Sequence, residues 1–295
     1  MLVVLVAIVA VNVVLIFGFG PARTTTPTAV VVAAGDIAAC YSEGDEATAE
    51  LLEDIEGTVL TLGDNVYPHG TAENFRECYE PSWGEFKGRT KPVPGNHEYE
   101  TPGASGYFGY FGAAAGDPGE GYYSYDLGGW HVVALNSNCE EVGGCDASSP
   151  QARWLEEDLA ANEDEACTLA YFHHPLFASG SYRPGVGAVK PLWKALYAAD
   201  ADVVLNGHDH NYQRFAPQRP DGTLDPERGI REFVVGTGGG SLYEIESPLN
   251  NLEVYNDGAY GVLKLTLRPS AYDWEFVPEA GESFTDSGSQ RCRQG

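Results

Sequence analysis

The chain has 295 residues, of which 43% are hydrophobic, and this is enough apolar material for one large domain or two small ones. Its formal net charge is −26, so its surface repels nucleic acids and anionic membranes, and no nucleic-acid partner is expected. An anionic ligand would be repelled as well, so a site for one must supply positive charge locally.

The N-terminal segment is apolar from Leu2 to Phe19 with the exception of Asn12. Its length of about 18 residues is the lower limit for a membrane-spanning helix. No basic residue precedes the apolar run, although export signals normally carry one. We expect residues 1–20 to be a membrane anchor or an export signal rather than a buried core strand. Residues 21–28 are expected to be a tether, and residues 29–295 a single domain.

Strand-like and helix-like segments alternate over the first two thirds of the chain. Short strand-like runs lie at residues 29–34, 58–62, 91–94, 168–172 and 202–206. Helical spacing of apolar residues predicts helices at residues 45–55 and 188–199, and Ser149 followed by Pro150 indicates another helix start. This alternation is typical of βαβ connections.

Other segments have the pattern of antiparallel strands. Residues 122–127 and 130–136 flank Gly128-Gly129, which predicts a hairpin with a two-residue turn. Residues 232–235, 262–267 and 272–277 resemble the strands of an antiparallel meander. The mixture predicts an α/β fold with two packed sheets and helices on their outer faces.

The six cysteines indicate disulfides and therefore an oxidising compartment outside the cytoplasm. None belongs to a C-x-x-C pair, which argues against a structural zinc site. Cys139 and Cys145 bracket a short loop, so we expect them to pair, and we expect Cys40 to pair with Cys78 and Cys167 with Cys292. Buried free thiols in a cytosolic protein are the alternative.

A polar cluster follows each of the five strand-like runs. The clusters are Gly35-Asp36, Gly63-Asp64-Asn65-Val66-Tyr67, Gly95-Asn96-His97-Glu98, His173-His174-Pro175 and Gly207-His208-Asp209-His210. Loops at the C-terminal ends of strands in an open α/β sheet meet in one crevice. We therefore expect these five loops to share a site.

The side chains of these clusters are suited to a pair of metal ions. Two cations about 3.5–4 Å apart can hold the attacking and leaving oxygens of a phosphoryl transfer, and they need a bridging carboxylate with further N and O ligands. The candidate ligands are Asp36, Asp64, Tyr67, Asn96, His173, His208 and His210. Alternate residues of an extended segment point to opposite sides, so His208 and His210 can each reach one metal. Taken alone, His208-x-His210 also fits a mononuclear zinc site.

These ordered motifs resemble those of the purple acid phosphatases, a branch of the calcineurin-like metallophosphoesterase superfamily. The resemblance covers most of residues 30–275 and implies a two-sheet β-sandwich flanked by helices. Most of the superfamily has Asp-x-His in the first motif, whereas this chain has Asp36-Ile37-Ala38. The purple-type branch substitutes a tyrosinate from the second motif, and Tyr67 occupies that place.

The resemblance also implies a set of ligands for each metal. Metal one would be held by Asp36, Asp64, Tyr67 and His210, and metal two by Asp64, Asn96, His173 and His208, with Asp64 bridging. The resemblance therefore implies two metal ions per chain. A phenolate is a hard anion and favours Fe(III), so we expect Fe(III) with a divalent partner that is Zn, Mn or Fe.

Two further histidines are candidates for contact with the substrate. His97 follows the ligand Asn96, and the matching family residue lies near the phosphate, so we assign it as general acid or electrostatic stabiliser. His174 is either a catalytic, substrate-contacting residue or a structural one. The histidine that many relatives carry after the Pro-Leu-aromatic run is absent from residues 179–185. The segment 236–240 is expected to be a tight turn whose backbone approaches the site.

The sequence thus predicts an exported phosphatase that cleaves small phosphate monoesters by attack of a metal hydroxide on phosphorus. Asn96, His97 and His174 are the predicted substrate-binding residues. A phosphodiesterase or nucleotide-sugar hydrolase on the same metal core, and a non-catalytic metal-loaded protein of the cell surface, are the alternatives. We expect a monomer, either secreted or anchored in the membrane by its N-terminus.

Overall fold

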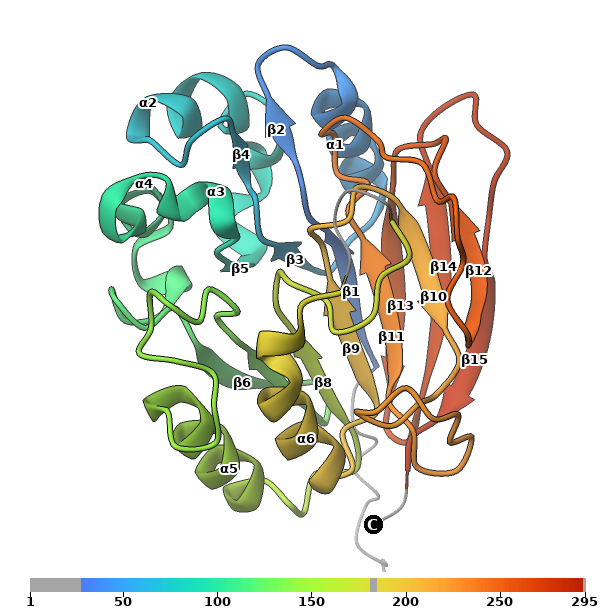
Figure 1. The fold of residues 1–295 in the computed structure, drawn as a ribbon. Coiled ribbons are helices and arrows are strands. Elements are labelled where there is room, and N and C mark those ends of the chain that lie inside the picture. Colours follow the sequence, from blue (N-terminus) through green and yellow to red (C-terminus); the bar gives the residue numbers. More distant parts are fainter. Residues whose placement is uncertain (1–27, 181–184, 294–295) are drawn as a thin grey trace, which may run out of the picture.

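The computed structural model describes residues 28–180 and 185–293 of the chain. Two β-sheets pack face to face and helices lie on their outer faces (Figure 1), so the predicted fold class is confirmed. The predicted anchor or export signal at residues 1–20 lies outside the described residues, as does the tether except for its last residue. Within the described part of the chain, no helix has the length and apolar character needed to cross a bilayer.

The first sheet has six strands in the order β15-β14-β13-β1-β3-β5. Their bounds are β1 (Ala29–Ala34), β3 (Thr58–Leu62), β5 (Thr90–Val93), β13 (Gly261–Arg268), β14 (Ala271–Pro278) and β15 (Ser287–Arg291). The strands β1, β3 and β5 are parallel neighbours, so their C-terminal ends lie at one edge. Two of the predicted runs, 29–34 and 58–62, have the observed bounds, and the third is shifted by one residue.

The second sheet has seven strands in the order β12-β10-β11-β9-β8-β7-β6. Their bounds are β6 (Tyr123–Leu127), β7 (Trp130–Ala134), β8 (Thr168–Tyr171), β9 (Val203–Asn206), β10 (Tyr212–Phe215), β11 (Arg231–Val235) and β12 (Leu252–Asn256). The hairpin predicted at Gly128-Gly129 joins β6 to β7. The strands β7, β8 and β9 are parallel, which places the C-terminal ends of β8 and β9 side by side.

The predicted meander of three late strands is only partly correct. The strands β13 and β14 form an antiparallel pair as expected. The strand β11 belongs to the other sheet, where it runs parallel to β9 and antiparallel to β10. Because alternate side chains of any strand face opposite sides, the apolar pattern cannot say which sheet a strand joins.

The helices cover the outer faces of both sheets and one end of the fold. Their bounds are α1 (Gly44–Asp54), α2 (Ala72–Asn74), α3 (Asn96–Tyr99), α4 (Ser105–Phe111), α5 (Pro150–Ala161) and α6 (Lys190–Ala198). A small parallel pair of strands, β2 (Ala38–Ala39) and β4 (Val66–Tyr67), lies beyond the first sheet. The helix α1 packs next to β13, whereas α5 and α6 pack on the second sheet (Figure 1). Ser149 caps α5 by accepting a hydrogen bond from the Ala152 N–H, as its sequence predicts.

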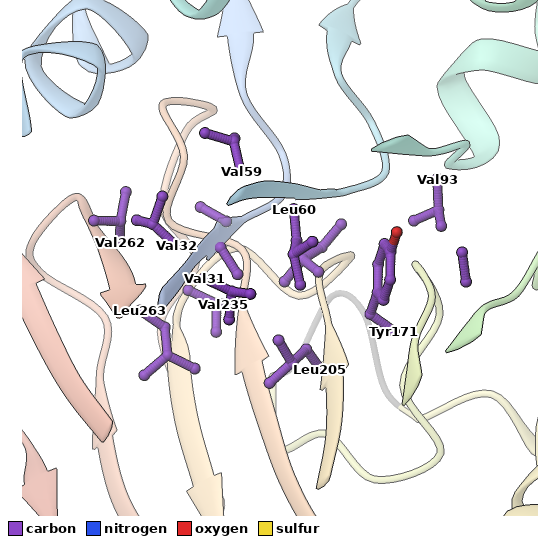
Figure 2. Packing of buried hydrophobic residues seen from close by; sticks show 14 of the residues in the cluster. Val31, Val32, Val59, Leu60, Val93, Tyr171, Leu205, Val235, Val262 and Leu263 are labelled. Carbon is purple, nitrogen blue, oxygen red and sulfur yellow. The ribbon is translucent and has the colours of Figure 1, made fainter. Parts of the chain in front are cut away.

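The core between the two sheets is made of fully buried aliphatic and aromatic side chains. Val31 and Leu60 of the first sheet approach Leu205, Val235 and Tyr171 of the second (Figure 2). Burial of one such side chain stabilises the fold by about 1.5–3 kcal/mol. Close packing here holds the strands rigidly, and therefore fixes the loops that leave their C-terminal ends.

Three disulfides form in the predicted pairs, Cys40–Cys78, Cys139–Cys145 and Cys167–Cys292. The last joins residues 125 positions apart and ties the C-terminal segment to the start of β8. No cysteine among the described residues is free, and this arrangement fits an extracellular protein.

Candidate metal centre

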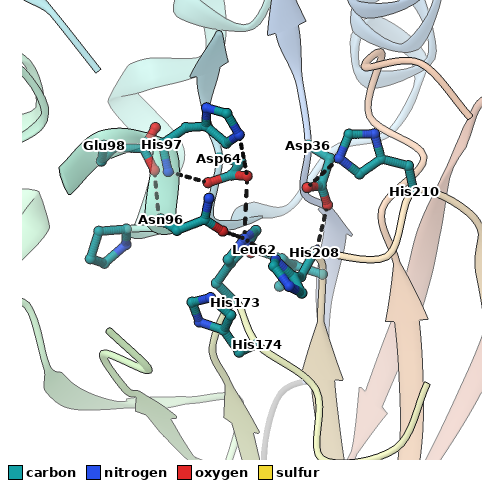
Figure 3. Close-up of polar contacts among 12 residues, drawn as sticks. Asp36, Leu62, Asp64, Asn96, His97, Glu98, His173, His174, His208 and His210 are labelled. Carbon is teal, nitrogen blue, oxygen red and sulfur yellow. Dashed lines mark hydrogen bonds and ion pairs between the residues drawn. The ribbon is translucent and has the colours of Figure 1, made fainter. Parts of the chain in front are cut away.

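The seven predicted metal ligands come together where the two sheets meet. Figure 3 labels all of them except Tyr67. Asp36 follows β1, Asp64 follows β3, and Tyr67 ends β4. Asn96 begins α3, directly after the loop that leaves β5. His173 follows β8, and both His208 and His210 lie between β9 and β10. The donors therefore come from the C-terminal edges of both sheets.

Asp36, Tyr67 and His210 form one set of donors. The Tyr67 hydroxyl lies 3.0 Å from Asp36 Oδ1 and 3.0 Å from His210 Nε2. His210 Nε2 lies 3.2 Å from the same Asp36 oxygen. The second Asp36 oxygen accepts a hydrogen bond of 2.7 Å from the His208 backbone N–H, which fixes the carboxylate.

Asn96, His173 and His208 form a second set. His173 Nε2 lies 3.2 Å from Asn96 Oδ1 and 3.2 Å from His208 Nδ1. The His173 and His208 rings meet edge to face, with centroids 4.9 Å apart. This grouping is the one expected for metal two.

Asp64 touches both sets. Its Oδ2 lies 3.1 Å from the Tyr67 hydroxyl and 3.3 Å from His173 Nε2. Its Oδ1 accepts a hydrogen bond of 2.9 Å from the His97 backbone N–H. The carboxylate thus occupies the position that a bridging ligand requires.

Hydrogen bonds to backbone carbonyls set the tautomers of two imidazoles. His173 Nδ1 donates to the Leu62 carbonyl at 2.9 Å, and His210 Nδ1 donates to the Ser241 carbonyl at 2.7 Å. In the neutral rings the Nε2 atoms that face the carboxylates therefore carry lone pairs, which is the usual orientation of a metal-binding histidine.

The glycine before a ligand allows a neighbouring ligand to come close. A Cβ on Gly95 would lie 2.1 Å from Asp64 Oδ1, and a Cβ on Gly207 would lie 2.6 Å from Asp36 Oδ2. This is the physical reason for the repeated Gly-ligand pattern in the sequence. The segment 236–240 also approaches the site as predicted, because a Cβ on Gly236 would lie 2.8 Å from Asp36 Oδ2.

Three candidate ligands have left-handed backbone conformations. The φ angles are 59° at Asp36, 47° at Asp64 and 72° at His208. Such conformations cost about 1–3 kcal/mol each and cluster at functional sites. They also correct one expectation, because the segment from His208 to His210 is bent rather than extended. The two imidazoles reach different donor sets through this bend, and not through strand alternation.

The buried charges of the site are strongly coupled. Burial alone would raise the pKa of Asp64, but the His173 and His97 charges and hydrogen bonds hold it well below its usual range. Burial alone would lower the pKa of His173, and the carboxylates of Asp64 and Asp36 instead raise it to about 9. Burial and the same carboxylates raise the pKa of Tyr67 well above 10. A tyrosinate at this position therefore requires a strong positive charge close by.

The donor set fits two metal ions. Asp36 and Asp64 are buried to 0% and 2% exposure, and among the described residues only histidines supply possible positive charge within 4 Å of them. Asp36, Asp64 and His173 present ligand atoms that all lie within 4.8 Å of one another, as do His173, His174 and His208. Carboxylate, phenol, amide and imidazole donors suit hard and borderline cations. The two sets would hold one ion each, with Asp64 shared.

His97 and His174 lie beside the candidate ligands. His97 Nδ1 donates to the Pro68 carbonyl at 2.6 Å, and its Nε2 lies 3.9 Å from Asp64 Oδ2. The strand β8 ends at Tyr171, so His174 lies beyond it and is not turned away from His173 by strand alternation. Its ring centroid is 4.4 Å from that of His208.

Glu98 is a site residue to which sequence reasoning gave no role. It is fully buried, and its two oxygens accept hydrogen bonds from the backbone N–H groups of Asn65, Val66 and Gly95. Burial and the Asp64 charge raise its pKa to about 7, while the Gly95 N–H favours the carboxylate. Glu98 thus connects the loops of Asp64 and Asn96. Glu98 lies three residues after Gly95, which is the spacing of a helix-capping glutamate, and this spacing could have indicated its role from the sequence.

Two further residues support the imidazoles. Ser137 Oγ lies 2.8 Å from His174 Nδ1 and accepts a hydrogen bond from the His174 N–H. Tyr243 stacks on His210 with ring centroids 4.3 Å apart. Ser137 belongs to a polar run, Asn136-Ser137-Asn138, that follows β7. The rule that identified the other loops would therefore have identified it, whereas no pattern indicates Tyr243.

Comparison with known proteins supports this interpretation of the fold. The calcineurin-like phosphoesterase family model matches residues 29–212. Purple acid phosphatase 15 of Arabidopsis thaliana is 28% identical over 246 residues, which are 71% of this chain and 44% of that protein. A nucleotide pyrophosphatase/phosphodiesterase of Hordeum vulgare is 24% identical, with 84% of this chain and 76% of that protein covered.

A solved structure has the same fold. The purple acid phosphatase isolated from yellow lupin (Lupinus luteus) seeds superposes with a TM-score of 0.72 at 19% identity, covering 91% of this chain and 54% of that one. The chain spans less than half the length of the Arabidopsis relative. The family model covers more than half of the chain, and the relatives agree with it. The chain therefore belongs to the calcineurin-like phosphoesterase family, as a purple acid phosphatase-like member.

Proposed function

We propose that the chain is an exported hydrolase that uses two metal ions to cleave phosphate monoesters. The observation that carries this proposal is the sharing of Asp64 between two sets of donors, because a carboxylate between two cations is the central requirement of such a site. The seven donors lie at or just beyond the C-terminal ends of strands, and hydrogen bonds fix Asp36, His173 and His210, so the site is preorganised.

The donor types indicate which ions would bind. Asp36, Tyr67 and His210, with Asp64, would hold Fe(III), because a phenolate favours a hard trivalent cation. Asn96, His173 and His208, with Asp64, would hold Zn, Mn or Fe as a divalent ion. When bound, such a pair supplies positive charge that polarises the phosphoryl group and lowers the pKa of water.

The chain's own residues would then orient the ester and move the proton. His97 Nε2 faces the Asp64 carboxylate and Nδ1 donates to the Pro68 carbonyl, so it is the imidazolium form of the ring that would present an Nε2 proton to the leaving alkoxide. Asn96 and His174 lie on the side where the rest of the substrate would sit. Three disulfides support a location outside the cytoplasm, secreted or anchored.

A phosphodiesterase or nucleotide-type hydrolase is the second candidate, because the Hordeum relative carries that name. Substrate loops rather than metal ligands distinguish the two activities. Hydrolysis of p-nitrophenyl phosphate and of bis(p-nitrophenyl) phosphate by the purified protein separates them. Faster cleavage of the diester would replace the monoesterase proposal.

The proposal is tested with metal analysis, a visible spectrum and one pair of variants. The protein, folded under oxidising conditions, should contain two metal ions and show a tyrosinate-to-Fe(III) absorption band that disappears in Tyr67→Phe. Asp64→Ala should remove hydrolysis, whereas Asp54→Ala, an exposed aspartate at the end of α1, should not. One metal per chain would indicate the mononuclear zinc alternative. Unchanged hydrolysis in Asp64→Ala would refute the assignment of the site.

A further inference from the structure

A cavity of about 440 Å³ opens beside the candidate metal centre. Asn96 and His174 line it on the side of the metal ligands. The rest of its lining includes Val186 and three glutamates, which are Glu100, Glu140 and Glu141. The volume is in the usual range for small-molecule sites. A phosphate group held by the two metals would therefore extend its alcohol portion into this cavity.

The wall that carries Glu140 and Glu141 is a fixed structure. It is the loop closed by the Cys139–Cys145 disulfide. The Gly144 N–H donates to the Cys139 carbonyl at 2.8 Å, and the Glu141 N–H donates to the Asn138 carbonyl at 3.0 Å. Asn138 Nδ2 also donates to the Pro94 carbonyl at 3.2 Å, which joins this wall to the loop before Asn96. The backbone that carries these two exposed glutamates is therefore held at a defined position relative to the metal centre.

The described lining of the cavity has negative charges and no Lys or Arg. Among residues 28–180 and 185–293, neither Glu140 nor Glu141 has a Lys or Arg nitrogen within 4 Å. Glu100 differs, because its carboxylate lies 2.8 Å from His69 Nδ1. The lining carboxylates with no Lys, Arg or His nitrogen within 4 Å among the described residues are therefore those of the disulfide-closed wall.

On the basis of the proposed function, we infer that this wall selects phosphate monoesters by the charge of their alcohol. The phosphoryl group is attracted by the metals, whereas the alcohol portion faces two carboxylates. Esters of neutral or positively charged alcohols are favoured, and esters of alcohols that carry a carboxylate or a second phosphate are rejected. The same wall disfavours nucleotide polyphosphates, whose leaving group is itself an anion.

The size of the effect follows from Coulomb's law. Two unit charges about 7 Å apart in water change an equilibrium constant by about threefold. An ammonium and a carboxylate on otherwise similar alcohols differ by two charges, so each glutamate changes their relative preference by about sevenfold. Two glutamates give about 50-fold at low salt, and less at physiological ionic strength, where the Debye length is about 8 Å.

The test compares O-phosphoethanolamine with 2-phosphoglycolate, which are similar in size and opposite in the charge of their alcohol. The measured quantity is the ratio of their kcat/KM values in the wild-type protein and in Glu140→Gln/Glu141→Gln. Comparing the two proteins cancels the intrinsic reactivity of each ester. The control is Glu156→Gln/Glu157→Gln on α5, which removes the same net charge from an adjacent exposed pair.

The expected result is a wild-type preference for phosphoethanolamine that falls about 50-fold in the variant at low salt and is unchanged in the control. A ratio within twofold of the wild-type value, or an equal fall in the control, would overturn the inference. If the proteins hydrolyse neither ester, calorimetric binding of both esters measures the same selectivity without turnover. Failure of the proposed function has a different result: no ester is hydrolysed by either protein, while a calorimetric preference of the wild type for phosphoethanolamine that the variant loses still supports the inference, and equal binding selectivity in the two proteins overturns it.

Discussion

Replacement of Glu98 by glutamine tests whether the metal-binding loops depend on one buried carboxylate. The two oxygens of Glu98 accept from the backbone N–H groups of Asn65 at 2.8 Å, Val66 at 3.3 Å and Gly95 at 2.6 Å. Glutamine has the same shape but only one oxygen. Whichever way its amide turns, its NH₂ group faces at least one backbone N–H, and two donors then meet without an acceptor.

The magnitude follows from these contacts. A hydrogen bond to a charged group contributes about 1.5–3 kcal/mol, and a buried donor without a partner costs about 1–3 kcal/mol. We therefore expect Glu98→Gln to lower the free energy of unfolding by about 2–4 kcal/mol. Because the displaced loops carry Asp64 and Asn96, we also expect kcat/KM to fall by about 10- to 100-fold, as for other residues that orient metal ligands.

Urea unfolding at pH 8 measures the first effect, because the Glu98 pKa of about 7 leaves the carboxylate ionised there. Hydrolysis of p-nitrophenyl phosphate measures the second. Glu157→Gln, on the exposed face of α5, is the matched control and should change stability by less than about 0.5 kcal/mol. A destabilisation by Glu98→Gln as small as that of the control, with full activity, would refute the reasoning.

Three other changes have defined outcomes. Burial raises the pKa of Glu232 well above its usual range, so its contribution to stability is complete below the unfolded-state pKa and is lost as pH rises toward the folded-state pKa. Glu232→Gln should therefore gain about 1.4 kcal/mol per pH unit over the wild type between pH 5 and 6 in urea unfolding, and a difference independent of pH would contradict this. Gly207→Ala places a Cβ 2.6 Å from Asp36 Oδ2 and should reduce both bound metal and kcat/KM, the latter by about 100-fold, as metal analysis and steady-state kinetics would show. Replacing Cys167 and Cys292 by serine opens a loop of 125 residues and should lower the free energy of unfolding in urea by about 5 kcal/mol. Removing the Cys139–Cys145 disulfide, with a separation of 6 residues, should lower it by about 2 kcal/mol. Similar losses for both disulfides would exclude the loop-entropy explanation.

The residues that could be placed from sequence are those whose role follows from local pattern. Asp36, Asp64 and Asn96 each follow a glycine at the end of a buried strand, and parallel neighbours bring such ends together. The β-branched runs of β1 and β3 were long and apolar enough to give their bounds. The Cys139–Cys145 pair was also predictable from its short loop, whereas the other two pairs, although correct, had no local pattern to support them.

Features that depend on distant segments were not predictable. Glu98 accepts hydrogen bonds from the backbone N–H groups of Asn65 and Val66 in a distant stretch of the chain, and its sequence neighbours show only the local cap at Gly95. Tyr243 reaches His210 from a loop without regular structure. The strand β11 has the alternation of any half-buried strand, so its place in the second sheet depends on tertiary packing.

The origin of the donors in both sheets links metal binding to the architecture. In the proposed assignment, each ion has ligands from the first sheet and at least one histidine from the second, His210 for one ion and His173 and His208 for the other. Each ion would therefore be coordinated by residues from both sheets, and it would hold the sheets together in addition to the hydrophobic core between them. Ligands that bind only the folded state raise its stability with the logarithm of their concentration over Kd. Loss of the ions would consequently remove contacts that join the two sheets, and the stability of the fold would depend on the metal concentration in the compartment where the protein folds.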